Sequence, residues 1–189
     1  MTKKRNIKND SEFRLYPLIL EKLKDLGWNT KTISRGGSVY TQTELRNNEE
    51  LKFALDGKVP ENIVKINEKE YWVIEAKSEP GHLNKAIQDA ENYAERINQK
   101  SELNCCIITG ISGSPDSTYY VETKHKFNNS WITLLINDQK ATGFISPEQM
   151  DQLLTHGKLI EYEIDDDLFN RRTENINKIF HEGSINKRK

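Results

Sequence analysis

The sequence predicts an α/β fold in which a central mixed sheet of four or more strands is flanked by helices. Three observations predict this class. Residues 60–66 and 70–77 are short strand-like runs joined by a polar turn, which indicates an antiparallel hairpin. Residues 82–99 carry an apolar stripe at helical spacing. Residues 104–111 form a continuous apolar run, which is typical of a strand covered on both faces.

The N-terminal part of the chain is predicted to begin with a helix over residues 9–28, with Asp10 or Ser11 as its N-cap. Pro17 either kinks this helix or marks where its regular part begins, near Tyr16.

After an irregular stretch, a second helix is predicted over residues 43–57, with Thr43 as its N-cap. Downstream of the apolar run we expect strands over residues 117–127 and 131–137, a well-signalled helix over 146–157 and a further strand over 158–164.

Length and composition bound the class of protein. A chain of 189 residues is long enough for one compact domain with tails. No stretch approaches the length of about eighteen apolar residues that a membrane span needs, and no apolar segment follows the basic start, so we expect a cytoplasmic protein without a membrane partner. The formal net charge of −1 counts against a dedicated nucleic-acid binder. Cys105 and Cys106 are adjacent without metal-ligand spacing, and we interpret both as buried structural residues.

The second strand of the hairpin carries a charged pair on one face. Glu75 and Lys77 are two residues apart and therefore point to the same side of the sheet. The opposite side is apolar, with Trp72, Ile74 and Ala76. Placing a carboxylate and an ammonium at the end of a buried type of strand costs desolvation free energy, and a chemical role is one reason to tolerate it.

Phosphodiester hydrolysis needs a hard cation held by carboxylate oxygens and a positive group near the charge of the transition state. Glu75 and Lys77 could fill these two roles. Glu61 is the candidate for a second carboxylate, because the hairpin brings it opposite Glu75. A two-residue loop would instead pair Glu61 with Ala76 and point it to the wrong face. We therefore predict an odd loop or a bulge that restores pairing with Glu75 or Lys77.

Pro60-Glu61, thirteen further residues and then Glu75-Ala76-Lys77 resemble the motif of the PD-(D/E)xK nuclease superfamily, in which Pro-Asp, a spacer and Glu-x-Lys form the metal and catalytic site. Glu61 stands where the family more often has Asp. The resemblance implies a restriction-endonuclease-like fold and Mg²⁺-dependent hydrolysis of DNA, with Mn²⁺ as a substitute metal. It also implies that Glu61 and Glu75 hold the metal while Lys77 stabilises charge or orients water.

The resemblance extends over about residues 10–110 to nuclease domains of the type I restriction motor subunit and of fused nuclease-methylase enzymes. In those families an acidic residue on an N-terminal helix precedes a Gly-aromatic pair, as Glu12 precedes Gly27-Trp28 here. This implies that Glu12 assists metal binding, with Glu21 as the alternative. A favourable interaction of Glu12 with the helix dipole is the plainer interpretation.

The same families carry, after Glu-x-Lys, a helix with a Gln shortly before Tyr-Ala, which implies auxiliary residues on the helix ahead of Tyr93-Ala94. By strict spacing Asp89 occupies the place of that Gln, and Gln88 is one residue away from it. Both side chains could simply be solvated. Tyr93 has the spacing of the packed apolar stripe, which favours a role in the core.

The resemblance also implies a domain organisation. Residues 1–165 would be the endonuclease-like domain, and residues 166–189 a helical linker toward an N6-adenine methylase region. The implied partners are double-stranded DNA and the methylase, specificity or motor regions of a restriction-modification system. Two other hypotheses stay open: a catalytically inactive nuclease-fold module for DNA binding or assembly, and an RNA- or repair-directed nuclease with the same site.

Overall fold

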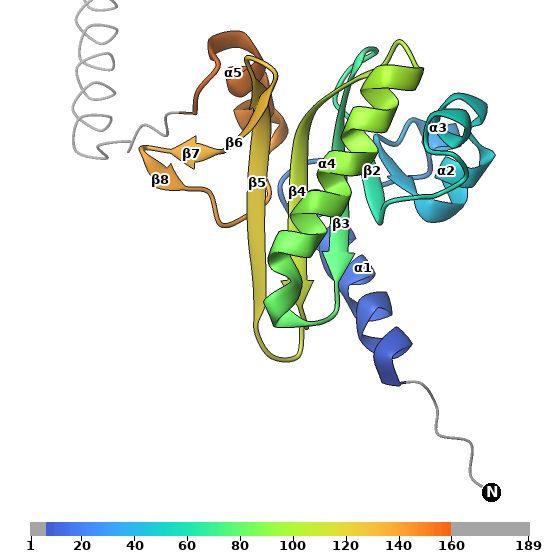
Figure 1. Cartoon of the computed structure of the whole chain (residues 1–189), viewed down its shortest axis with the longest axis vertical. Coiled ribbons are helices and arrows are strands. Elements are labelled where there is room, and N and C mark those ends of the chain that lie inside the picture. Colours follow the sequence, from blue (N-terminus) through green and yellow to red (C-terminus); the bar gives the residue numbers. More distant parts are fainter. Residues whose placement is uncertain (1–6, 160–189) are drawn as a thin grey trace, which may run out of the picture. The chain divides into compact units, whose positions relative to one another are not determined.

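The computed structural model describes residues 7–159, with side chains from Leu15 onward. Six strands form one mixed sheet in the order β1-β2-β3-β4-β5-β6 (Figure 1). They are β1 (Val39–Thr41), β2 (Asn62–Lys65), β3 (Glu70–Lys77), β4 (Asn104–Gly113), β5 (Tyr119–Phe127) and β6 (Ser130–Thr133). β3 and β4 are parallel, and the other neighbouring pairs are antiparallel. The predicted α/β class with a mixed central sheet is confirmed.

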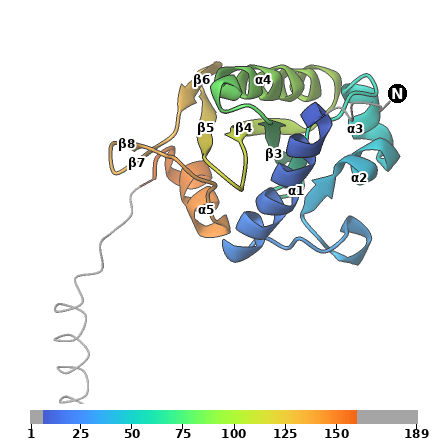
Figure 2. The same cartoon turned by 90° about the horizontal axis from the view of Figure 1, so that it is seen from below.

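Helices cover both faces of this sheet. They are α1 (Ile7–Asp25), α2 (Gln42–Asn47), α3 (Glu49–Ala54), α4 (Leu83–Lys100) and α5 (Pro147–His156), with short 3-10 turns η1 (Ile33–Arg35) and η2 (Pro80–His82). A separate small hairpin consists of β7 (Leu135–Ile136) and β8 (Gln139–Lys140). Figure 2 shows α4 on one face of the sheet and α1 with α5 on the other. No helix within residues 7–159 is long and apolar enough to cross a membrane.

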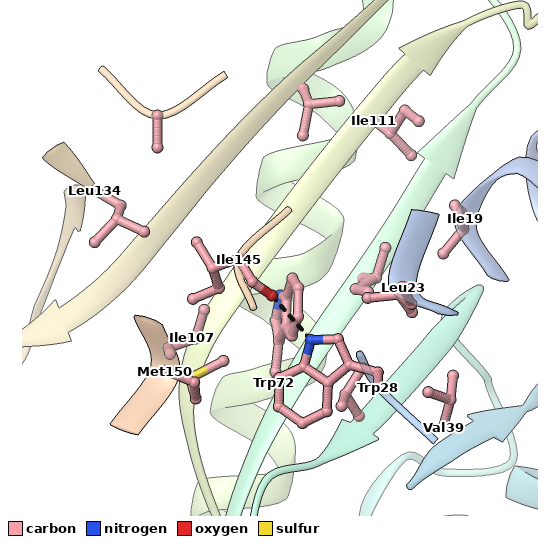
Figure 3. Close-up of a cluster of buried hydrophobic side chains, with 14 of the residues drawn as sticks. Ile19, Leu23, Trp28, Val39, Trp72, Ile107, Ile111, Leu134, Ile145 and Met150 are labelled. Carbon is pink, nitrogen blue, oxygen red and sulfur yellow. Dashed lines mark hydrogen bonds between the residues drawn. The ribbon is translucent and has the colours of Figure 1, made fainter. Parts of the chain in front are cut away.

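The core on the α1 side is centred on two tryptophans (Figure 3). The ring of Trp72 on β3 is fully buried and lies 5.9 Å from the ring of Trp28, centroid to centroid. Each indole N–H has a partner: Trp28 Nε1 donates to the Ile145 carbonyl oxygen at 2.9 Å, and Trp72 Nε1 donates to Thr109 Oγ1 at 2.9 Å. These bonds satisfy polar groups that would otherwise destabilise an apolar core.

The core on the α4 side depends on small residues. Ala86, Ala90 and Ala94 are fully buried, on the helix that was predicted to carry an apolar stripe. On β4, a Cβ added to Gly110 would lie 2.8 Å from the backbone nitrogen of Ile87, so α4 rests directly on this glycine. This close approach fixes α4 over β3 and β4, and with it the side chains that α4 presents at the edge of β3.

The first predicted helix begins and ends earlier than expected, because α1 spans Ile7–Asp25 rather than residues 9–28. α1 begins at Ile7, so the predicted N-cap at Asp10 or Ser11 is wrong: both residues lie inside the helix. No proline or glycine lies between Ile7 and Asp10 to end the helix earlier. Pro17 also lies inside α1, which continues through it.

The single helix predicted over residues 43–57 is two short helices. Its predicted N-cap, Thr43, is wrong, because the Thr41 hydroxyl caps α2 in a capping box with Glu44. Asn48 separates α2 from α3, and its side chain accepts the N–H of Leu51 as the cap of the second helix.

Two of the sequence predictions about strands also need correction, and a third is not tested. β1 lies in the stretch expected to be irregular, and it pairs with β2 at the edge of the sheet. The strand predicted over residues 131–137 divides at Leu134, because a turn with positive φ at Asn137 and Asp138 pairs β7 with β8 instead. The predicted strand over 158–164 lies almost wholly outside the described residues, as does the predicted linker over 166–189.

The cysteine prediction is correct for Cys105, which is buried, whereas Cys106 is only partly buried. Cys106 packs against the core on the α1 side. The helix predicted over residues 146–157 is α5, with Ser146 as its N-cap and Gly157 at its end.

Candidate functional site

The register of β2 and β3 places two carboxylate-bearing residues opposite one another. The ladder pairs Asn62 with Ile74, and one further step in the same register sets Glu61 opposite Glu75. Glu61 is the residue just before β2, and its backbone N–H donates to Glu75 Oε2 at 3.3 Å. The predicted pairing of Glu61 with Glu75 is confirmed.

The turn between these strands explains the register. Ile66 N–H donates to the Glu70 carbonyl oxygen at 2.9 Å, which leaves a loop of three residues, an odd number. The Asn67 side-chain oxygen accepts the N–H groups of Lys69 and Glu70, each at 2.9 Å. The Asn side chain stabilises this three-residue turn. The turn sets the register that places Glu61 and Glu75 on the same face of the sheet, as the alternation of side chains requires.

Glu75 is a buried carboxylate, with 8% of the residue exposed. It lies on the α4 side of the sheet, whereas Trp72, Ile74 and Ala76 belong to the core on the α1 side, as predicted. Burial raises the pKa of Glu75, and although Lys77 acts against this effect, the pKa remains above its ordinary value. The site therefore holds a carboxylate whose negative charge is only partly offset.

Lys77 lies between two carboxylates. Its Nζ is 2.6 Å from Glu75 Oε1 and 2.9 Å from Asp89 Oδ2. Burial alone would lower the pKa of Lys77, but the charges and hydrogen bonds of Glu75 and Asp89 outweigh burial and raise the pKa above its ordinary value. Lys77 is therefore a protonated donor held in a defined position.

α4 brings only some of its predicted auxiliary residues to this site. Asp89 faces β3 and binds Lys77. Tyr93, one turn later, is half-buried against the core, and burial followed by the charge of Glu75 raises the pKa of its phenol. Gln88 is exposed and points into a cleft between α4 and β5 that Glu122 and Glu91 also line. Of the two residues near the position of the family's Gln, Asp89 contacts Lys77, whereas Gln88 lines the cleft between α4 and β5.

Two further residues lie near Glu61 that the sequence analysis did not identify. Gln42 Nε2 at the start of α2 donates to Glu61 Oε2 at 3.3 Å. Burial raises the pKa of the Tyr16 phenol on α1, and the nearby carboxylates of Glu44 and Glu61 raise it further. The pattern Thr-x-x-Glu over residues 41–44 indicates a helix start, but nothing in the sequence places this helix beside Glu61.

Glu12 was predicted to assist metal binding from the N-terminal helix. It lies in α1, but its side chain is outside what the structure describes, and so is any contact it makes. Glu21, the alternative, lies in the same helix and is exposed.

The side chains at this site are hard oxygen donors grouped around one ammonium. Within the described part of the chain, no three or more histidine, cysteine, aspartate or glutamate side chains form a metal-binding cluster. Mg²⁺ is commonly held by one or two carboxylates together with water and substrate phosphates. Glu61, just before β2, and Glu75 on β3 are the pair that could hold such a cation here.

No known protein family, curated protein or solved structure matches this chain.

Proposed function

We propose that the chain is a Mg²⁺-dependent endonuclease domain that hydrolyses phosphodiester bonds in double-stranded DNA. One observation carries this proposal: a buried Glu75 joined to Lys77 at the end of β3, with Glu61 set opposite by an odd-numbered loop. Fold stability alone does not require this arrangement, because a buried ion pair is commonly no more stabilising than apolar residues of similar volume.

The donor set fits a hard divalent cation. Among the described residues, Glu75 Oε1 accepts from Lys77 and Oε2 accepts from the Glu61 N–H, whereas a carboxylate has about four acceptor positions in all. Glu61, just before the neighbouring strand β2, provides a second carboxylate. Glu61 and Glu75 would hold the cation, and Mn²⁺ would substitute for Mg²⁺ because both prefer carboxylate oxygens.

Each residue has a defined task in the proposed reaction. When bound, Mg²⁺ would polarise the phosphoryl group and lower the pKa of water. Lys77 remains protonated because of its two carboxylate neighbours, so it donates hydrogen bonds to the developing charge rather than accepting a proton. The attacking water gives a proton to solvent and its oxygen bonds to phosphorus as the bond from phosphorus to the leaving sugar oxygen breaks, and that sugar oxygen takes a proton from solvent water. Asp89 fixes the direction of the ammonium.

The fold supports the same proposal. A mixed six-stranded sheet with helices on both faces is compatible with a restriction-endonuclease-like fold. We propose that the chain works in the cytoplasm within a restriction-modification system, with DNA recognition supplied by methylase, specificity or motor regions. Glu12 on α1 remains a proposed assistant to metal binding.

Nicking of supercoiled plasmid DNA with Mg²⁺ or Mn²⁺ tests the proposal. Glu75→Gln and Lys77→Ala should each abolish metal-dependent nicking. Glu68→Gln and Lys69→Ala are matched controls, because these residues lie in the exposed turn at the other end of the same hairpin, and both should nick like the wild type. Nicking that survives in Glu75→Gln would contradict the proposal, since it would come from a different site or a contaminant.

A second candidate function is a catalytically inactive nuclease-fold module for DNA binding or assembly. The observation that favours it is the double ion pair of Lys77, because the ammonium itself neutralises the carboxylates that a metal would otherwise neutralise. Calorimetric titration with Mn²⁺ separates the two functions. If the chain is a nuclease, the wild type binds Mn²⁺ through Glu75 and Glu75→Ala does not. If it is an inactive module, neither the wild type nor Glu75→Ala shows heat of Mn²⁺ binding.

A further inference from the structure

The amide side chain of Gln42 lies against the Glu61 carboxylate. Gln42 Nε2 donates to Glu61 Oε2 at 3.3 Å, and both residues are partly buried. Gln42 is the first residue of α2, and this helix follows directly on β1, the strand next to β2. The contact therefore joins residues nineteen positions apart at one end of the sheet.

The backbone that carries Gln42 is fixed on both sides. The Thr41 hydroxyl accepts the Glu44 N–H at 3.3 Å, and the Glu44 carboxylate accepts the Thr41 N–H at 2.9 Å. The other oxygen of Glu44 accepts the N–H of Ile33 at 2.9 Å, which ties the preceding loop to the same helix start. Gln42 thus presents its amide from a rigid turn.

The backbone of Glu61 is fixed as well. Its N–H donates to Glu75, and the following residue, Asn62, is buried in the ladder with its side chain bonded to the Tyr40 carbonyl oxygen at 3.1 Å. Gln42 acts on the side chain that extends from this fixed backbone. A glutamate has one more rotatable bond than an aspartate, so its carboxylate has more conformational entropy to lose on binding a cation.

We propose that Gln42 is a positioning residue that holds the Glu61 carboxylate beside Glu75, so that both carboxylates serve one divalent cation. The inference rests on the proposed function and deepens it. An amide suits this task better than a lysine, because it directs the carboxylate without neutralising its charge. The hydrogen bond from Gln42 takes one acceptor position at Oε2, and a carboxylate has about four in all.

Calorimetric titration of the metal-free protein with Mn²⁺ tests this role without depending on catalysis. Gln42→Ala and Gln42→Met, which keeps the length of the side chain, should each weaken Mn²⁺ affinity by about three- to tenfold, the cost of immobilising one flexible side chain. Thr43→Ala is the matched control, because Thr43 lies exposed in the same first turn of α2, and it should bind Mn²⁺ like the wild type.

A double-mutant cycle with Glu61→Asp shows whether Gln42 acts through Glu61. The shorter aspartate withdraws its carboxylate from Gln42, so Gln42→Met should have little further effect on Mn²⁺ affinity in that background. An equal loss in both backgrounds would overturn the inference, because Gln42 would then act on something other than Glu61.

The outcomes separate the inference from the proposed function. If the wild type binds Mn²⁺ and the Gln42 variants bind it as tightly as Thr43→Ala does, the positioning role is overturned and the proposed metal site stands. If the wild type gives no heat with Mn²⁺, the proposed metal site fails and the positioning role fails with it.

Discussion

Lys77 Nζ and Asp89 Oδ2 lie 2.9 Å apart, and this ion pair joins the end of β3 to the second turn of α4. The Lys77 side chain is 17% exposed and that of Asp89 is 31% exposed, so the pair is only partly screened by water. Lys77 also contacts Glu75 from its own strand. If Glu75 binds a cation, Asp89 is the partner that keeps the ammonium in place.

Asp89→Ala should therefore lower the rate of DNA cleavage by about ten- to hundredfold, since a misplaced catalytic group can cost as much as about a hundredfold. Asp89→Asn should retain more activity, because its side-chain oxygen still accepts from Lys77. Gln88→Ala should cleave at the wild-type rate, because Gln88 points into the cleft between α4 and β5. Single-turnover kinetics with excess protein gives these rates. A larger loss for Gln88→Ala than for Asp89→Ala would reverse this assignment.

Gly110→Ala should destabilise the fold by about 1–3 kcal/mol, the usual cost of overpacking a core. The new Cβ would lie 2.8 Å from the backbone nitrogen of Ile87, so α4 must move away from β4. Gly143→Ala is the control, because a Cβ there meets nothing within 4 Å. Urea unfolding at constant pH gives the free energies of unfolding. Equal stability of the two variants would show that α4 is not held at this glycine.

The stability of the protein should depend on the protonation of His125. Burial lowers the pKa of this residue on β5 below its ordinary value of 6.5, so the folded state favours the neutral imidazole. As the pH falls below 6.5 the unfolded chain takes up the proton first, and the stability that His125 contributes is lost as the pH falls through the folded pKa.

Urea unfolding at pH 5 and pH 7.5 should therefore show a smaller loss of stability on acidification in His125→Gln than in the wild type. Other titrating groups contribute equally to both proteins and cancel in the comparison. The same loss of stability in both would mean that burial of His125 does not favour its neutral form.

Local patterns predicted much of the fold and the centre of the candidate site. The alternation of side chains placed Glu75 and Lys77 on the face opposite Trp72. Because Glu61 must share their face, it also predicted an odd loop or a bulge, and the structure has the odd loop. The apolar stripe predicted for residues 82–99 is the face by which α4 packs on the sheet, and Gly110 on β4 allows its close approach.

The remaining features depend on contacts that local patterns do not encode. β1 has only three residues and is a strand because β2 pairs with it. By strict spacing Asp89 takes the place of the family's Gln, but only the rotation of α4 on the sheet shows that Asp89 meets Lys77. Gln42 meets Glu61 only because β1 and β2 are neighbours.

Cleavage in water enriched in ¹⁸O tests the central claim most directly, because it reports the source of the new oxygen as well as the activity. A short DNA duplex is incubated with excess protein and Mg²⁺, and the masses of the products are measured by mass spectrometry. We predict one ¹⁸O atom in the new terminal phosphate with wild-type protein, and no product with Glu75→Gln or without metal. Intact DNA in every sample, or the same product from Glu75→Gln, would contradict the claim that Glu61, Glu75 and Lys77 form a hydrolytic site.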